Sequence, residues 1–275
     1  MTFQKLWTRG AIYVVLASFA IYYLLPIYLL VITGLKTNEE VNVDWMWRLP
    51  TGIHFDGFNQ AWPKVSANFI NSFLITVPAA VISSFIGSIN GYIYAKWKFR
   101  GSNTIFILFL FGMFLPYQGI LIPLVQTLVF FHLYATLVGV IFVHCIFGIP
   151  ITALMFRSYF AGVPSELVDA GKIDGCGFFG IYRYLMLPIA FPAFAVVLIW
   201  QFTTIWNDYL IGLVVLSNPR LAPVNVAVQN LAGTYTTQWQ VQMSGALIAA
   251  LPTIVVYLAL GKFFMRGLLS GSVKG

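Results

Sequence analysis

The 275-residue sequence has few charged side chains: Asp, Glu, Lys and Arg together make up 8% of it, while 60% of its residues are hydrophobic. A soluble globular domain usually has about a quarter of its residues charged, so a fold built around a core in water is excluded. The two cysteines, Cys145 and Cys176, lack CxxC spacing, which excludes a disulfide framework. The composition indicates a chain whose solvent is largely lipid.

The sequence also lacks the motifs of a nucleotide-hydrolysing or metal-dependent enzyme. A Walker A loop requires G-x-x-x-x-G-K-[ST], and the Gly-Lys pairs at 171–172 and 261–262 have neither the upstream glycine nor the following Ser or Thr. His144 and Cys145 are adjacent, and neighbours on a helix diverge by about 100°, a poor geometry for sharing a metal. We therefore expect no catalytic residue, no metal site and no cofactor bound by this chain.

Six apolar segments are each long enough to cross a bilayer. A helix needs about 20 largely apolar residues to cross about 30 Å of hydrocarbon, and backbone groups in lipid have to find their hydrogen bonds within the segment. The expected spans lie at about residues 11–32, 69–95, 104–130, 137–156, 189–216 and 243–264. The prediction is an all-α integral membrane protein with six transmembrane helices in a single domain, residues 1–275.

Basic residues predict the orientation, with both termini in the cytoplasm and the bilayer as a partner of the chain. Eleven of the fifteen Lys and Arg residues then lie on the cytoplasmic side: Lys5, Arg9, Lys96, Lys98, Arg100, Arg157, Lys172, Arg183, Lys262, Arg266 and Lys274. The outer segments keep Lys36, Arg48, Lys64 and Arg220. This bias follows the positive-inside rule, so the net charge of +7 is a topology signal and gives no support to nucleic-acid binding.

A polar insert at 163–192 interrupts the apolar pattern between the fourth and fifth spans. Pro164 suits a first helical position, and a helix to about Asp174 would place four residues on one face by i, i+3, i+4 and i+7 spacing. These are Leu167, Ala170, Gly171 and Asp174. Gly175 can end this helix in a left-handed conformation. We expect a helix-turn-helix at the cytoplasmic surface with its small-residue face turned outward for docking; an ordinary, well-capped loop is the alternative.

The same insert resembles the EAA loop of permease subunits in bacterial binding-protein-dependent ABC importers. The family pattern is Glu-Ala-Ala, three residues, Gly, nine residues and Ile-x-Leu-Pro. Here Asp169-Ala170-Gly171, Gly175 and the run 185–188 stand at that spacing, with Asp for Glu, Gly for the second Ala and Leu for Ile. The stretch WNDY at 206–209 and the C-terminal RGLLSGSVKG resemble the carbohydrate-importer branch, and the MalG-like permease subunits in particular.

The resemblance implies the fold of a type I ABC importer transmembrane domain in a bacterial or archaeal cytoplasmic membrane. It implies as partners a non-identical sister permease, two ABC ATPase subunits that bind ATP and Mg, and a periplasmic or lipid-anchored sugar-binding protein. The loop at 157–188 would couple the chain to the ATPase. The residues carried over to that role are Glu166, Asp169, Ala170, Gly171, Asp174, Gly175 and Pro188. On this view Gly171→Glu leaves insertion intact and abolishes sugar uptake.

Sugar-binding residues are sought among aromatic, amide and hydroxyl side chains, because aromatic faces stack on sugar rings and the polar groups bond their hydroxyls. The candidates in the fifth span are Gln201, Thr204, Trp206, Asn207 and Asp208. An acidic residue within a membrane span suggests a functional role by default. Solvation at the membrane interface explains the presence of Asp208 near the end of its span equally well. Candidates for contact with the binding protein are Gln238, Trp239 and Gln240.

The tail and the last outer loop resemble those of glucose or mannose importers, and this resemblance implies glucose or mannose as the substrate. The alternative class is an ion-coupled secondary sugar transporter. Such a carrier usually has buried charges within its spans and an internal inverted repeat, and the sequence shows one marginal acid and no repeat.

Overall fold

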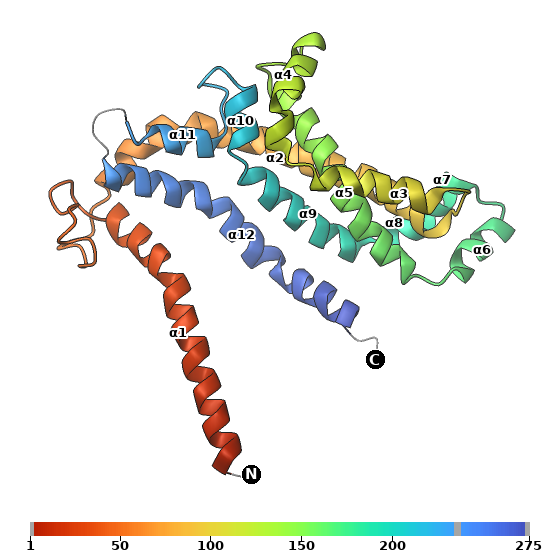
Figure 1. Cartoon of the computed structure of the whole chain (residues 1–275), viewed down its shortest axis with the longest axis horizontal. Coiled ribbons are helices and arrows are strands. Elements are labelled where there is room, and N and C mark those ends of the chain that lie inside the picture. Colours follow the sequence, from red (N-terminus) through yellow and green to blue (C-terminus); the bar gives the residue numbers. More distant parts are fainter. Residues whose placement is uncertain (1–2, 234–237, 273–275) are drawn as a thin grey trace. The chain divides into compact units, whose positions relative to one another are not determined.

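The computed structural model describes residues 3–233 and 238–272, and the regular structure within these ranges is helical throughout (Figure 1). The helices are α1 (Phe3–Gly34), α2 (Asp56–Lys96), α3 (Ser102–Phe111), η1 (Gly112–Phe114), η2 (Tyr117–Ile120), α4 (Leu121–Phe130), α5 (Leu137–Ala161), α6 (Glu166–Ile173), α7 (Phe178–Ile181), η3 (Tyr182–Met186), α8 (Leu187–Ile189), α9 (Phe191–Trp206), α10 (Leu210–Val215), α11 (Val224–Asn230) and α12 (Trp239–Ser272).

Four of the expected spans are confirmed as single long apolar helices. They are Arg9–Gly34, Asp56–Lys96, Leu137–Ala161 and Trp239–Gly261. Two further pairs of helices are each apolar enough to cross but are bent, so the described residues contain up to six spans if each pair counts as one. The fourth span extends to Ala161, five residues past the predicted end at 156, and the loop expected to begin at 157 therefore begins as helix.

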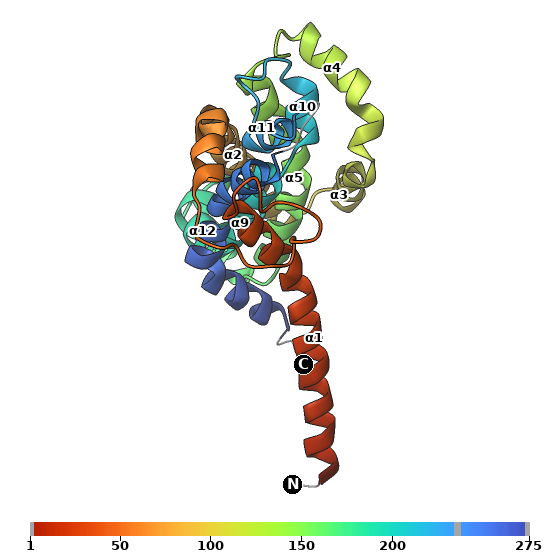
Figure 2. The ribbon, with the colours of Figure 1, turned by 90° about the vertical axis from the view of Figure 1, so that its left-hand side faces the viewer.

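The third span is not the continuous helix predicted over 104–130. The segments Ser102–Phe114 and Tyr117–Phe130 meet at 87°, and Figure 2 shows α4 turning away from α3. Leu115 and Pro116 between them are extended, with ψ of 123° and 110°. A proline lacks the N–H that a helix needs and disfavours the helical conformation of the residue before it, so the helix ends at this pair.

The fifth span is also shorter than the predicted 189–216. Helix α9 ends at Trp206, because the next two side chains compete with the helical backbone. Asn207 Nδ2 donates to the carbonyl of Thr203 at 2.9 Å, and Asp208 Oδ1 accepts the backbone N–H of Ile211 at 2.9 Å. The second bond caps α10, which is a separate short helix.

The chain forms two compact units, one of residues 1–66 and 227–250 and one of residues 67–226 and 251–275. Within the second unit, α2 and α5 approach closely at two glycines of α2. A Cβ built on Gly91 would lie 2.6 Å from Phe156 Cβ, and one on Gly87 would lie 2.6 Å from Thr152 Cβ. The two glycines form a G-x-x-x-G pair, a spacing that lets membrane helices pack with their backbones close together.

In the first unit, two buried charges fix the loop that follows α1. Lys36 Nζ donates to the carbonyls of Trp45 at 2.8 Å and Met46 at 3.2 Å. The carboxylate of Glu40 accepts three bonds, from the backbone N–H of Thr37 at 3.0 Å and from the N–H and hydroxyl of Thr51 at 2.8 and 2.5 Å. These bonds, the Thr51 hydroxyl first, lower the pKa of Glu40 from an ordinary 4.5 to about 2.

We expect this loop to loosen in acid and to loosen at neutral pH in Glu40→Gln. A depressed carboxyl pKa contributes stability that is complete above the ordinary value of 4.5 and is lost as the pH falls towards about 2. In Glu40→Gln the amide NH2 group would face N–H or hydroxyl donors of Thr37 or Thr51. Leaving those groups without an acceptor lowers the free energy of unfolding by about 1–3 kcal/mol. Hydrogen exchange of peptides from 35–55 measures the effect, with the exposed Glu39→Gln as the matched control. A loop equally protected in both variants would contradict the assignment.

Candidate functional site

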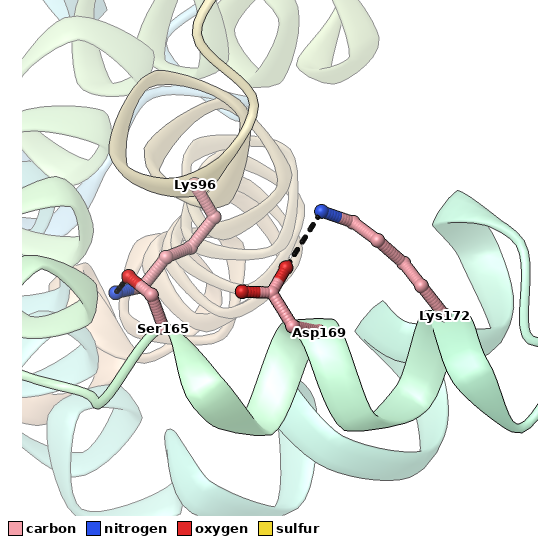
Figure 3. A network of polar contacts seen from close by, with 4 residues as sticks. All are labelled: Lys96, Ser165, Asp169 and Lys172. Atoms are coloured by element: carbon pink, nitrogen blue, oxygen red, sulfur yellow. Dashed lines mark hydrogen bonds and ion pairs between the residues drawn. The ribbon is translucent and has the colours of Figure 1, made fainter.

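The insert predicted to couple with a partner folds as a short helix held at its start and along its side. Helix α6 follows α5 after a four-residue turn and begins at Glu166, two residues later than the expected Pro164. Lys96 at the end of α2 donates to the carbonyl of Val163 and to Ser165 Oγ, the latter at 3.4 Å. Figure 3 shows the contact between Lys96 and Ser165. It also shows the exposed ion pair in which Lys172 Nζ lies 3.0 Å from Asp169 Oδ1. The α6 start is therefore fixed to α2.

The small-residue face of α6 is divided between the surface and the interior. Leu167, Ala170 and Asp174 are exposed as predicted, but Gly171 is buried. A Cβ at 171 would lie 3.0 Å from Leu185 Cδ1 and 3.1 Å from Ile181 Cγ1. The prediction that Gly171 faces outward is wrong: the glycine lets α6 lie against the following helical segment of its own chain. A glutamate there would disturb the fold, so Gly171→Glu does not test docking.

The predicted end of α6 at Gly175 is confirmed. Gly175 has φ of 78°, a left-handed conformation that glycine adopts readily. The N–H of Cys176 donates to the carbonyl of Gly171 at 2.9 Å, which is the long bond of a Schellman motif. Glu166, Asp169, Ala170, Asp174 and Gly175 are then the exposed members of the predicted coupling set on α6 and at its end, in the part of the second unit where Figure 1 shows α6 beyond α5.

The second half of the insert connects α6 to the membrane helices. Helix α7 continues into the π-helical turn η3 and the short helix α8, in which Pro188 is exposed near the first position. The hydroxyl of Tyr159, on α5, donates to the carbonyl of Ile189 at 2.7 Å. The segments Phe178–Ile189 and Phe191–Trp206 meet at 77°, so the insert turns sharply into α9 at a point bonded to α5.

The five sugar-path candidates do not share one surface. Gln201 is buried and donates to Ser83 Oγ at 2.7 Å, and Trp206 is buried with its ring stacked 5.5 Å from that of Phe202. In this conformation both side chains pack inside the chain, and their place on a solute path stays a prediction. Thr204 and Asn207 are exposed, and Asp208 is partly buried at the start of α10.

A cavity beside Asp208 is too small for a sugar. It has a volume of about 10 Å³ and is lined partly by His144, Ser72 and Thr76. A single water requires at least about 10–15 Å³ by this measure. In this conformation Asp208 caps a helix, and the cavity beside it does not hold a sugar.

Of the binding-protein candidates, Gln238 and Trp239 are exposed, whereas Gln240 is buried. Gln240 Nε2 donates to Asn38 Oδ1 at 3.0 Å and links α12 to the loop after α1, so contact between this residue and a partner stays a prediction. The neighbouring residues 234–237 lie outside the described ranges.

Sequence reasoning treated Lys96 and Arg157 only as topology signals. The structure places both at the ends of long helices next to the insert, where Lys96 holds α6 and Arg157 lies over the Phe106 ring at 4.2 Å. Nothing in the sequence indicates the role of Tyr159. These contacts join residues far apart in the chain, and no local spacing pattern indicates them.

Comparison with known proteins agrees with this geometry. Residues 87–269 match the family described as binding-protein-dependent transport system inner membrane component. The chain is 42% identical over 269 residues to a probable ABC transporter permease protein of Pyrococcus horikoshii, with 98% of each chain covered. It is 35% identical to the xylose/arabinose import permease of Haloferax volcanii, covering 94% of this chain and 92% of that protein.

The fold matches that of a chain in a solved ABC transporter. A chain from the crystal structure of a bacterial ABC transporter involved in the import of the acidic polysaccharide alginate superposes with a TM-score of 0.82, at 20% identity, covering 96% of this chain and 99% of that one. The all-α, multi-span prediction is thereby confirmed. The chain belongs to the family of inner-membrane components of binding-protein-dependent transport systems.

Proposed function

We propose that this chain is one permease subunit of an ATP-driven sugar importer and forms half of a translocation pore with a non-identical sister subunit. It is a transport component of the inner membrane and not itself an enzyme. Sugar as the cargo is supported by the 35% identity to a pentose permease over 94% of the chain. Glucose or mannose is the specific substrate we favour.

The observation that carries the proposal is the form of the insert. A motif at EAA spacing folds as a short helix with Leu167, Ala170 and Ile173 exposed, Ile173 by 86%. An exposed apolar row beside Glu166 and Asp174 suits a cleft on a soluble partner better than it suits water. We propose that this row docks into an ABC ATPase, which supplies ATP and Mg, and that α6 transmits ATP-driven closure to the spans.

The experiment is reconstitution of the chain with its sister permease, ATPase and binding protein in liposomes. We expect uptake of radiolabelled glucose or mannose that requires both ATP and the binding protein, with xylose and arabinose as the competing substrates. Sugar movement by this chain alone along an ion gradient would replace the importer proposal with a secondary carrier. Uptake of pentoses in preference to hexoses would contradict only the choice of sugar.

A further inference from the structure

A wide hollow lies at the ends of α2 and α5, next to the start of α6. Its volume is about 770 Å³. Its lining residues, all within the second unit, are Tyr94, Ala95, Lys96, Lys98, Arg157, Ser158, Ala161 and Ser165. Three of these eight are cations, three carry a hydroxyl and none is an acid, so the hollow has the chemistry of an anion site.

Lys96 and Arg157 keep N–H groups that their hydrogen bonds within the chain do not use. A Lys ammonium has three N–H groups, and Lys96 directs two of them to Val163 and Ser165. Arg157 gives one of its five N–H groups to Asn103 Oδ1 at 3.4 Å while its guanidinium lies over Phe106. Glu166 interacts electrostatically with Lys96 from α6, yet it does not line the hollow.

The position of the hollow indicates which kind of anion would bind there. Lys96 and Arg157 lie near the last turns of two membrane-crossing helices, on the cytoplasmic side by the positive-inside rule. Tyr94 and Trp97 flank Lys96, as aromatic side chains commonly do at headgroup level. The hollow therefore opens where the anionic headgroups of the inner leaflet lie, and basic pockets between spans on this side bind such headgroups.

We propose that this hollow binds the phosphate headgroup of an anionic phospholipid. Arg157 can hold two phosphate oxygens with its planar fork, and Lys96 and Lys98, which also line the hollow, add positive charge. The volume of about 770 Å³ lies within the range of about 300–1,000 Å³ typical of organic-ligand sites. It suits a headgroup with its glycerol better than a bare phosphate.

The bound headgroup has a structural consequence for the insert. Lys96 would contact the lipid phosphate while it holds Val163 and Ser165, the residues that lead into α6. An anionic lipid would therefore stabilise the turn between α5 and α6. This inference concerns lipid binding alone and does not depend on the sugar or on the ATPase.

Native mass spectrometry of the detergent-purified full chain tests the site, with phosphatidylglycerol or phosphatidylcholine added. We expect retention of phosphatidylglycerol, and affinity for it about tenfold or more lower in Lys98→Gln/Arg157→Gln, because each cation near a headgroup contributes about 1 kcal/mol. Lys64→Gln/Arg220→Gln removes two exposed cations from the outer segments and is the matched control. It should bind phosphatidylglycerol like the wild type.

A second variant covers the case in which loss of Arg157 impairs folding. Ala161 is exposed within the hollow, so Ala161→Glu adds a repelling carboxylate without disturbing packing and should weaken phosphatidylglycerol binding to the same degree. Equal binding by the wild type and Ala161→Glu would overturn the proposal. Complete displacement of the lipid by millimolar inorganic phosphate would also overturn it, in favour of a free-anion site.

Discussion

Ala170→Glu should reduce sugar uptake by about 100-fold or more while the protein still folds and inserts. Ala170 is exposed on α6, so the added carboxylate can extend into water in the resting structure. If this face enters a cleft on an ATPase, the charge is buried there without a partner, which costs about 3–5 kcal/mol, and each 1.4 kcal/mol is a factor of ten in binding. Uptake of labelled sugar and co-purification of the ATPase measure the loss.

The control for this prediction is Gln229→Glu, which adds one negative charge at an exposed position in α11. It should leave uptake and subunit association near the wild-type level. Normal uptake by Ala170→Glu would show that the exposed face of α6 does not dock. Loss of the folded protein from the membrane in Ala170→Glu would contradict the exposed placement of this residue.

Gly91→Leu should severely destabilise the protein. Its Cβ alone would lie 2.6 Å from Phe156 Cβ and 2.7 Å from Arg157 N, and α5 backbone cannot yield as a flexible side chain does. Overpacking of this kind costs about 1–3 kcal/mol and occasionally more, and a lost kcal/mol lowers the Tm of a chain this size by about 2–4 °C. At the upper end of this range, about 3 kcal/mol, the expected drop in a thermal unfolding assay is about 6–12 °C.

The matched control is Gly261→Leu, another helical glycine, at which a Cβ would meet nothing within 4 Å. Its Tm should stay within about 2 °C of the wild type, since substitutions away from packed sites usually change stability by less than about 0.5 kcal/mol. A Tm for Gly91→Leu as high as that of Gly261→Leu would disprove the close approach of α2 and α5.

Hydrophobic run length was enough to predict the spans but not their shape. The four single-helix spans follow from about 20 apolar residues in a row, although several begin or end at other residues than predicted. The bend in the third span depends on which of several span prolines breaks its helix: Pro26, Pro150 and Pro252 lie inside continuous helices, whereas Pro116 does not. Whether a proline breaks its helix depends on neighbouring segments, which can form hydrogen bonds with the backbone groups that the proline leaves free.

The insert shows a similar division. Spacing and glycine chemistry placed α6 and its end correctly, because capping and the left-handed turn are local effects. They could not show that Gly171 faces Ile181 and Leu185, since the side on which α7 packs is a tertiary choice. A small residue indicates that something approaches closely; it does not say whether the approaching surface belongs to the same chain or to a partner.

The bend at Leu115 and Pro116 limits what can surround it in the membrane. Both residues are extended, so the helical ladder is broken there, and local bonds remain: the Leu115 N–H donates to the Gly112 carbonyl at 3.4 Å, and the Pro116 carbonyl accepts from the Gly119 N–H at 2.9 Å. The side chains of Phe114 and Leu115 are nonetheless 78% and 52% exposed in the isolated chain. Water or another protein chain can bond backbone groups at a broken helix, whereas acyl chains cannot, so we expect one of the two beside this corner although the side chains around it are apolar.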